Sequence, residues 1–429
     1  MIASTDFTEG RLRELVEGCL RLALPIGARL PAEDEDWIAR GALDSMGHVD
    51  VLLCIEKAAG LPDLFARLEG EPPRTTQSVL AVLQRLVAER EQAAPSEELK
   101  SKTDLTGSAE IVGWGFSLGS RCIQAAAVEK AFGLSPGTIA DRAGIETVVQ
   151  VSEGENEVGL AIRACSAALE RAQIGAGDVD WIVCSSETFW HFPSLGSLLH
   201  SQLLARDACG VFDVGGACVG LLNSLSVAKS LLATGTASRI LVVTADVHSR
   251  HLAPGRVPGE FGGLFGDGAS AFLVSRSDDG DAVRPYRLGD FQFGCAGTFS
   301  SALVLSLELG GRLALQFEGE VLARAAVARL GRIMKDLELR TRLSLDAASS
   351  FATHQPNPRL VERLARQANL PLEKFPTVAK TCGNLGSSTC GVALAKALDE
   401  HAGKRADQRG PIFLAAVGPG MLWGGCVLF

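Results

Sequence analysis

A repeated order of short strands and longer helices is the feature that most constrains the fold of this chain. Short runs rich in β-branched residues, such as residues 179–188 (VDWIVCSSET) and 239–247 (RILVVTADV), alternate with longer amphipathic segments such as residues 157–174. The same order of elements comes twice, in two halves of similar length at about 108–276 and 285–429. Alternation of this kind predicts an α/β domain. Its repetition predicts a duplicated, layered α/β core.

A separate small module is predicted at residues 1–92. The segment after it, residues 93–107, begins with the polar sequence AAPSEELKSKTDL, lacks hydrophobic periodicity and is interpreted as a linker. Within the module, residues 9–24 and 78–90 place apolar side chains at helical spacing, and residues 41–60 add a third apolar stripe. The module carries 16 acidic against 10 basic residues, which is −6 of the chain's net charge of −9. We therefore predict an acidic, all-α bundle.

The middle of this module resembles a known attachment site. The sequence GALDSMGHVDVLLCIEKAAG is similar to the Asp-Ser-Leu segment of acyl and peptidyl carrier proteins, here with Asp44, Ser45 and Met46. In that family a phosphopantetheinyl transferase attaches 4'-phosphopantetheine to the serine that starts the second helix, and the resemblance places this serine at Ser45. The unpaired N–H groups of a helix N-terminus suit an attached phosphate. The alternative is that Asp44 and Ser45 only cap a helix.

One cysteine follows a predicted strand and opens a predicted helix. Cys218 lies in the sequence FDVGGACVGLLNSLSVAKSLLATG, residues 212–235. The positive end of a helix favours the thiolate, which is the nucleophilic form of cysteine. The small residues Gly215, Gly216 and Gly220 leave room beside it for a substrate. The alternative is a buried, inert cysteine.

Two polar residues occupy comparable turns in the second half. His354 follows an apolar strand in FATHQPNPRL, and Asn384 lies in the small-residue loop of KTCGNLGSSTCGVALAKAL, before another helix. Open α/β sheets place their sites at such strand-to-helix turns. Either residue alone could instead be an ordinary structural hydrogen-bonding group.

Together these segments resemble the β-ketoacyl carrier-protein synthase III branch of the thiolase superfamily. The resemblance covers about residues 108–429 and keeps the order of six motifs, which are FPS (192–194), FDVGGACVG (212–220), LFGDGASA (264–271), HQPN (354–357), GNLGSS (383–388) and GPGMLWG (418–424). It implies a thiolase-like, duplicated αβαβα layered fold. It also implies Cys218, His354 and Asn384 as catalytic residues. The implied substrate-binding residues are Phe192, Arg142, Asn357 and Gly420.

The enzyme implied by this resemblance is an acyltransferase that performs decarboxylative Claisen condensation in fatty-acid-type, polyketide or other specialised biosynthesis. Cys218 would take an acyl group from a thioester, and a malonyl-type thioester would then lose CO2 while His354 and Asn384 donate hydrogen bonds to its carbonyl oxygen. The neutral amide of Asn384 favours condensation, because a carboxylate there would repel the enolate. Two alternatives stay open: an acyltransferase of the same fold with an O, N or S acceptor, and a non-catalytic partner that displays a carrier arm.

Two departures from the family pattern bear on the oxyanion donors and on the form of the substrates. Pro419 has no N–H where a second oxyanion donor is expected, which leaves the Gly420 N–H as the candidate. Thr138 stands where relatives that use coenzyme A often present a tryptophan, although Arg142 is kept. This favours acyl and malonyl-type thioesters delivered on the chain's own carrier or on a partner carrier. Phe192 aligns with a position that reaches the neighbouring subunit, so the resemblance also implies a homodimer.

Composition disfavours several other classes of function. The net charge of −9 and the lack of a Lys/Arg-rich run disfavour nucleic acid as a partner. No apolar run approaches the roughly 18 residues that span a bilayer, and residues 1–15 lack a basic-then-apolar leader, so we expect a cytoplasmic protein without a membrane partner. Eleven cysteines without CxxC pairs favour reduced thiols. No histidine shows metal-ligand spacing, the nearest approach being His248 and His251, so no metal is expected.

Overall fold

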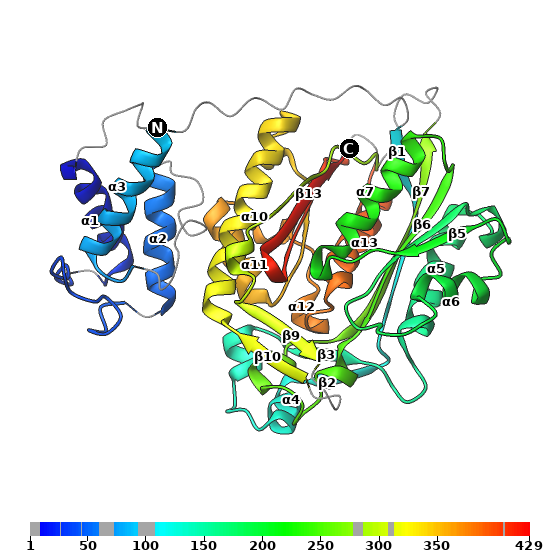
Figure 1. The fold of residues 1–429 in the computed structure, drawn as a ribbon, viewed down its shortest axis with the longest axis horizontal. Coiled ribbons are helices and arrows are strands. Elements are labelled where there is room, and N and C mark those ends of the chain that lie inside the picture. Colours follow the sequence, from blue (N-terminus) through cyan, green and yellow to red (C-terminus); the bar gives the residue numbers. More distant parts are fainter. Residues whose placement is uncertain are drawn as a thin grey trace. The chain divides into compact units, whose positions relative to one another are not determined.

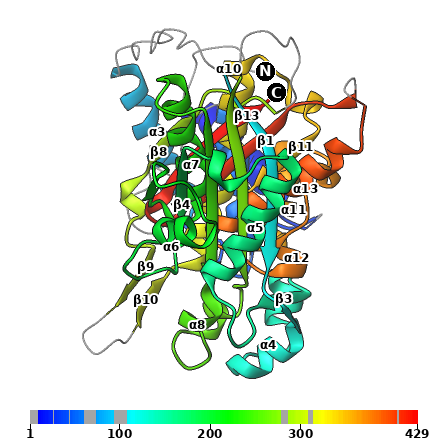
Figure 2. The same ribbon diagram turned by 90° about the vertical axis from the view of Figure 1, so that its right-hand side faces the viewer.

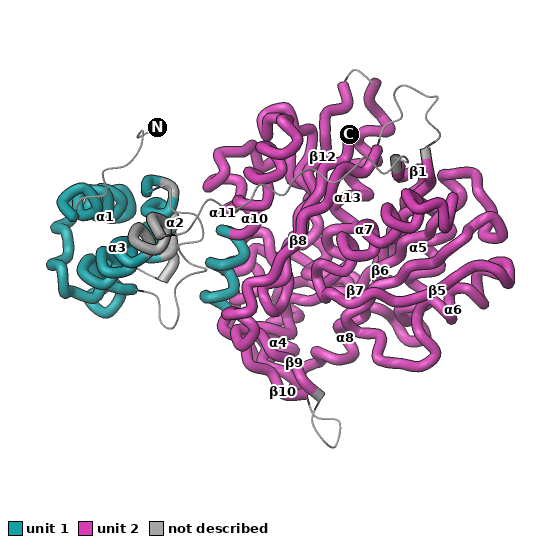
Figure 3. Tube along the Cα trace, turned by 45° about the horizontal axis from the view of Figure 1, so that its top comes forward, with its two compact units in different colours: residues 1–103, 319–328 teal, residues 104–318, 329–429 magenta. Residues whose placement is uncertain are grey.

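The computed structural model describes residues 9–25, 27–43, 45–59, 73–92, 108–277, 286–307, 313–405 and 408–429. The chain divides into two compact units, shown in different colours in Figure 3. Unit 1 comprises residues 1–103 with 319–328, and unit 2 comprises residues 104–318 with 329–429. The predicted linker, residues 93–107, lies outside the described residues.

Unit 1 contains a small helical bundle. Its helices are α1 (Glu9–Ala23), α2 (Ser45–Ala59) and α3 (Thr76–Gln92). Apolar side chains one or two turns apart on these helices form the core, among them Leu12, Val16, Leu52, Ile55 and Leu83, each at most 1% exposed. The sequence therefore predicted a helical bundle correctly. Its identity as a carrier stays a prediction.

The first sheet of unit 2 has five strands in the order β1-β7-β6-β4-β5 (Figure 1). The strands are β1 (Ser108–Leu118), β4 (Trp181–Ser185), β5 (Gly210–Asp213), β6 (Arg239–Val247) and β7 (Asp267–Ser277). Strand β4 is parallel to both β5 and β6, whereas β7 is antiparallel to both β6 and β1. The mixed sheet therefore has a parallel half and an antiparallel half.

The second sheet repeats this arrangement with four strands. They are β8 (Gln292–Cys295), β11 (Ser350–Thr353), β12 (Ile412–Gly418) and β13 (Leu422–Leu428), in the order β11-β12-β13-β8. Strands β11 and β12 are parallel, and the other two pairs are antiparallel. Strands β4-β6-β7-β1 thus match β11-β12-β13-β8 in order and direction. This match confirms the predicted duplication.

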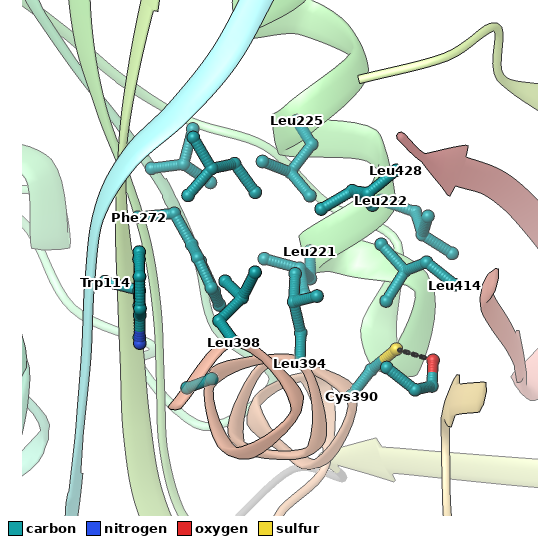
Figure 4. Close-up of a cluster of buried hydrophobic side chains, with 14 of the residues drawn as sticks. Trp114, Leu221, Leu222, Leu225, Phe272, Cys390, Leu394, Leu398, Leu414 and Leu428 are labelled. Carbon is teal, nitrogen blue, oxygen red and sulfur yellow. Dashed lines mark hydrogen bonds between the residues drawn. The ribbon is translucent and has the colours of Figure 1, made fainter. Parts of the chain in front are cut away.

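Helices form layers between and outside the two sheets. Helices α7 (Gly220–Ala233) and α13 (Ser387–Ala402) lie in the middle, where their leucines meet side chains from both sheets (Figures 1 and 4). Helices α5 (Glu157–Ala172) and α6 (Leu195–Gln202) cover the outer face of the first sheet (Figure 2). On the second sheet, α10 (Gly319–Thr341) packs Ile333 and Leu337 against Gly425 of β13.

Burial on both faces explains why β6 has a nearly continuous apolar sequence. Ile240 and Val242 belong to the central core with α7 and α13, whereas the alternate residues Leu241 and Val243 belong to the core under α5 and α6. Successive side chains of a strand point to opposite faces, so a strand between two helical layers needs apolar residues at every position.

Unit 2 also contains further strands, helices and one π-helical turn. They are β2 (Arg121–Gln124), α4 (Ala125–Phe132), a π-helical turn at Thr138–Ala143, β3 (Thr147–Gln150), α8 (His248–His251), α9 (Gly259–Gly262), β9 (Leu303–Leu307), β10 (Leu313–Phe317), α11 (Pro358–Ala368) and α12 (Ala379–Cys382). Among the helices that the structure describes, none combines the length and apolar character needed to cross a membrane.

Candidate active site

Cys218 lies in a tight turn between β5 and α7. It is the middle residue of a 3-10 turn, Ala217–Val219, and it is 7% exposed. Ala217 has a φ of 46°, in the left-handed region that costs an L-residue about 1–2 kcal/mol. The first turn of α7 reaches the end of β4, since a Cβ at Gly220 would lie 2.0 Å from Ser185 Oγ. The glycine at position 220 is therefore required for this close approach.

Glu187 is a site residue that sequence reasoning missed. It follows β4 by two residues, its Oε1 is buried without a hydrogen-bond partner among the described residues, and its negative charge acts on the pKa of the Cys218 thiol. The backbone N–H of Glu187 donates to Asp246 Oδ1 at 2.6 Å, and its carbonyl accepts from Trp190 Nε1 at 2.9 Å. These two contacts fix the main chain on both sides of the Glu187 Cα.

The carboxylate changes the expected protonation of the cysteine. Burial, and then the negative charge of Glu187, raise the pKa of the Cys218 thiol well above its usual value. The positive end of a helix acts in the opposite direction. Burial and Glu187 therefore oppose the thiolate that the helix N-terminus is predicted to favour.

His248 balances the charge of Glu187. Its Nε2 lies 3.6 Å from Glu187 Oε2, and its Nδ1 lies 3.2 Å from the carbonyl oxygen of Gly266. Burial alone would lower the pKa of His248, but Glu187, followed by Asp246, raises it to about 9. Burial likewise tends to raise the pKa of Glu187, yet the interaction with His248, and then that with Cys218, leave it below its usual value. At neutral pH the two side chains form an ion pair.

Asp246 holds the Glu187–His248 pair in place by accepting a hydrogen bond from the main-chain N–H of Glu187. It is fully buried on β6, and its Oδ2 accepts hydrogen bonds from Ser387 Oγ at 2.6 Å and from the Ser388 N–H at 3.3 Å. Burial, and then the charge of Glu187, raise the pKa of Asp246 to about 6. Asp246 thereby joins the end of β4 to the start of α13.

His354 lies at the end of β11, as predicted, and is 3% exposed. Its main-chain N–H donates to the Ala415 carbonyl. Its imidazole Nδ1 is buried without a partner among the described residues. Burial lowers the pKa of His354 to about 4, although the charge of Glu187 opposes this. The imidazole is therefore neutral at neutral pH and can donate one N–H.

Asn384 is held by its side-chain oxygen. Oδ1 accepts hydrogen bonds from the Gly386 N–H at 3.0 Å and from Thr389 Oγ1 at 3.1 Å. Because both partners donate, the atom between them must be oxygen, and the amide Nδ2 points the other way as a donor. Two residues later, a Cβ at Gly386 would lie 2.5 Å from His248 Cε1 and 3.1 Å from Glu187 Cδ. The loop that carries Asn384 therefore packs against the Glu187–His248 pair.

The loop after β12 borders the cysteine. A Cβ at Gly418 would lie 3.4 Å from both the N and the Cβ of Cys218. Pro419–Met421 forms a 3-10 turn in which Gly420 has a φ of 75°, and the Cys295 thiol donates to the Gly420 carbonyl at 3.3 Å. The role of the Gly420 N–H as an oxyanion donor stays a prediction.

The structure does not bring the other predicted residues into this cluster. Phe192 is fully exposed, and Arg142 is exposed on the π-helical turn. Asn357 caps α11, where its Oδ1 accepts from the Leu360 N–H at 3.0 Å. Ser45 is the first residue of α2 in unit 1, and its side chain lies outside the described atoms, as does Asp44 altogether.

One carboxylate thus connects the three predicted catalytic residues. Glu187 acts electrostatically on Cys218 and on His354, and it lies against the loop of Asn384. The cluster combines a nucleophile, a proton acceptor and two neutral donors. Such a set can form a covalent thioester intermediate and stabilise negative charge on a carbonyl oxygen.

Comparisons with known proteins agree with this chemistry. A family model for 3-oxoacyl-[acyl-carrier-protein (ACP)] synthase III matches residues 212–297, and the model for the C-terminal part of the same family matches residues 340–429. The β-ketoacyl-[acyl-carrier-protein] synthase III of Ruegeria sp. (strain TM1040) is 30% identical over 329 residues, which is 76% of this chain and 99% of that protein.

Solved structures show the same relationship. The crystal structure of 3-oxoacyl-[acyl-carrier-protein] synthase III from Aquifex aeolicus VF5 has a TM-score of 0.65 and 26% identity, over 75% of this chain and 99% of the other. The priming β-ketosynthase of the R1128 polyketide pathway has a TM-score of 0.65 and 26% identity, over 75% and 95%. OleA from Xanthomonas campestris, at 18% identity and a TM-score of 0.66 over 76% and 99%, shares the fold.

Proposed function

This chain belongs to the 3-oxoacyl-[acyl-carrier-protein] synthase III family of condensing enzymes, and we propose that it joins an acyl group held on Cys218 to a malonyl-type thioester with loss of CO2. The observation that carries the proposal is the cluster around Glu187. It contains a buried thiol in a strained turn, with a neutral imidazole and a fixed amide donor nearby.

The first half-reaction loads the enzyme. The Cys218 sulfur attacks the carbonyl of an acyl thioester, and the original thiol leaves. The negative charge of the tetrahedral intermediate needs N–H donors, for which we propose the backbone of Cys218 and Gly420 at the border between the two loops. The product of this step is an acyl-enzyme thioester.

The second half-reaction forms the carbon–carbon bond. As CO2 leaves the malonyl-type thioester, negative charge develops on its carbonyl oxygen. The N–H of neutral His354 and the Nδ2 of Asn384 are the donors for this oxygen, each worth about 3 kcal/mol in comparable sites. The enolate then attacks the acyl carbon on Cys218. The charge of Glu187 does not prevent this, because His248 neutralises it.

We also propose that unit 1 is a carrier with 4'-phosphopantetheine on Ser45, added by a phosphopantetheinyl transferase. The position fits the group, because Ser45 begins α2 and the first turn of this helix has no acidic residue to repel a phosphate. When attached, this group supplies a long arm whose thiol holds an acyl unit as a thioester. The chain's own carrier or a partner carrier would then serve Cys218, and tethering would raise its local concentration to about the millimolar range.

The proposal is tested by following CO2 and covalent loads together. The full chain, treated with a phosphopantetheinyl transferase and coenzyme A, is given an acyl thioester and malonyl-carrier. We expect an acyl load on Cys218, a phosphopantetheine load on Ser45 and release of CO2. Cys218→Ala should remove the acyl load and the condensation product. Ser45→Ala should remove only the phosphopantetheine load. An acyl load on Cys218 without CO2 release would overturn the condensation.

The carboxylate beside Cys218 also favours a second candidate function. A base at this position can activate an O–H, N–H or S–H acceptor for transfer of the acyl group out of the enzyme. Such an acyltransferase would discharge the acyl-enzyme to an acceptor in the absence of a malonyl thioester. CO2 release therefore separates the two functions.

A further inference from the structure

We propose that Glu187 is a catalytic residue, the general base that takes the proton of the Cys218 thiol while the sulfur attacks the acyl thioester. This role rests on the proposed function only in that Cys218 becomes acylated. It does not depend on what happens to the acyl group afterwards.

The position of Glu187 supports the role, because the carboxylate is placed by contacts that are independent of the cysteine. Its main-chain N–H and carbonyl are held by Asp246 and by Trp190 respectively. On the other side, Gly386 leaves just enough room for the carboxylate and for His248, since a Cβ there would lie 3.1 Å from Glu187 Cδ. The base is therefore in place before a substrate arrives.

The charges around Glu187 explain why it can accept a proton only during the attack. His248 forms an ion pair with it, Asp246 lies beneath it, and neutral His354 is nearby. The ion pair with His248 keeps the carboxylate ionised at neutral pH, and the same negative charge disfavours a free thiolate. Glu187 Oε1 is buried without a hydrogen-bond partner among the described residues, and the close approach of Gly220 to Ser185 holds the end of β4 against the turn of Cys218, so this oxygen is free to take a proton. Transfer of the proton becomes favourable as the sulfur gives up its electrons to the substrate carbonyl.

The proton balance of the step is complete within the site. The Cys218 proton moves to a Glu187 oxygen as the sulfur–carbon bond forms. The tetrahedral intermediate then collapses, the bond to the departing thiol breaks, and that thiol takes the proton back from Glu187. His248 stays protonated throughout, so the neutral ion pair is restored before the second substrate reacts.

The test compares two reactions of the same sulfur. The first is single-turnover acylation of Cys218 by acetyl, butyryl and octanoyl thioesters, presented on coenzyme A and on a phosphopantetheinylated carrier, and read by intact-protein mass spectrometry. The second is alkylation of Cys218 by iodoacetamide, which consumes the thiolate. Glu187→Gln should slow acylation at least about 100-fold, the lower range of general-base effects. The same variant should alkylate as fast as the natural protein or faster, because a negative charge beside the sulfur has been removed.

Slower acylation together with unchanged or faster alkylation indicates a general base, whereas a purely structural residue would change both rates in the same direction. Glu187→Asp, which keeps a shorter carboxylate, should recover part of the acylation rate. Glu110→Gln, at a glutamate that is 4% exposed on β1, controls for the loss of any buried carboxylate and should leave both rates unchanged.

Acylation of Glu187→Gln at the natural rate would overturn the inference, as would equal slowing of acylation and alkylation. Failure of the natural protein to load Cys218 with any of these acyl groups, on coenzyme A or on a carrier, would overturn this inference and the proposed function together. Normal loading without CO2 release would overturn only the condensation.

Discussion

The two halves of unit 2 have matching folds but contribute different chemistry. Both halves have the same order of core elements along the chain. In the first half this order is β1, α5, β4, α7, β6 and β7, and in the second half it is β8, α10, β11, α13, β12 and β13. Cys218 and Asn384 therefore precede corresponding helices, α7 and α13. Glu187 and His354 follow corresponding strands, β4 and β11.

The ionisable groups that handle protons lie in the first half. Cys218, Glu187, Asp246 and His248 come from its loops and strands, whereas the second half supplies an amide and a neutral imidazole. The strands are constrained by burial on both faces, so differences accumulate in the turns at their ends. We infer that the first half controls acylation and that the second half stabilises the enolate.

The largest loss of condensation activity is expected when the two hydrogen-bond donors of the second half are changed. Asn384→Asp and His354→Ala should each lower condensation about 10²–10³-fold, because each removes one donor to the enolate oxygen, and the carboxylate introduced by Asn384→Asp would also repel the enolate. Acyl loading of Cys218 should change little. CO2 release and mass spectrometry measure the two steps separately, and an equal loss in both steps would contradict the division.

The two halves also predict opposite effects of pH on stability. In the first half, His248 has its pKa raised from 6.5 to about 9, so its stabilisation is complete below pH 6.5 and is lost as the pH rises through 9. In the second half, His354 has its pKa lowered to about 4, so its stabilisation is present above pH 6.5 and is lost as the pH falls through 4. Each contribution is at most about 3 kcal/mol.

Thermal unfolding of His248→Gln and His354→Gln between pH 4 and pH 10 measures these contributions. The first variant should lose part of the alkaline decline in melting temperature, and the second part of the acid decline. A change on the same side of neutrality in both variants would contradict the assignment.

The contact between the halves can be tested at Gly386. Its φ is 58°, and a Cβ would lie 2.5 Å from His248 Cε1, so Gly386→Ala should destabilise the protein by about 1–3 kcal/mol and slow acylation. Gly177→Ala is the matched control, because its φ is not positive and its Cβ position is open. Chemical denaturation provides the free energies, and equal effects of the two substitutions would contradict the packing argument.

The smallest effect is expected at the loop that borders Cys218. Pro419→Gly restores an N–H in the second half, and we expect acylation to rise by less than about tenfold, or about 1.4 kcal/mol of barrier. Single-turnover loading measures the change. A decrease would show that the proline positions Gly418 or Gly420 more effectively than an added donor could.

The residues found from the sequence share a local signal. Cys218, His354 and Asn384 each stand at a turn whose flanking strand or helix can be identified from a short window. The duplication could be predicted for the same reason, since each half carries its own periodic segments. Asn357 shows the limit of such signals, because its local position explains a helix cap at least as well as a substrate contact.

Glu187 could not be found in this way. Its environment depends on Asp246 and His248, about 60 residues along the chain, and on Gly386, which belongs to the other half. In the sequence it is one acidic residue in the polar segment SSET. The effect of Glu187 on Cys218 could not be predicted for the same reason, because the helix is local in the sequence and the carboxylate is distant. An acidic residue two positions after a buried apolar strand is the signal that could have pointed to it.

The most direct test of this account measures acyl loading and CO2 release side by side in Glu187→Gln and Asn384→Asp. The account predicts that Glu187→Gln fails to load Cys218 at the natural rate. It predicts that Asn384→Asp loads normally but releases CO2 at least about 100-fold more slowly. Loss of the same step in both variants would contradict it.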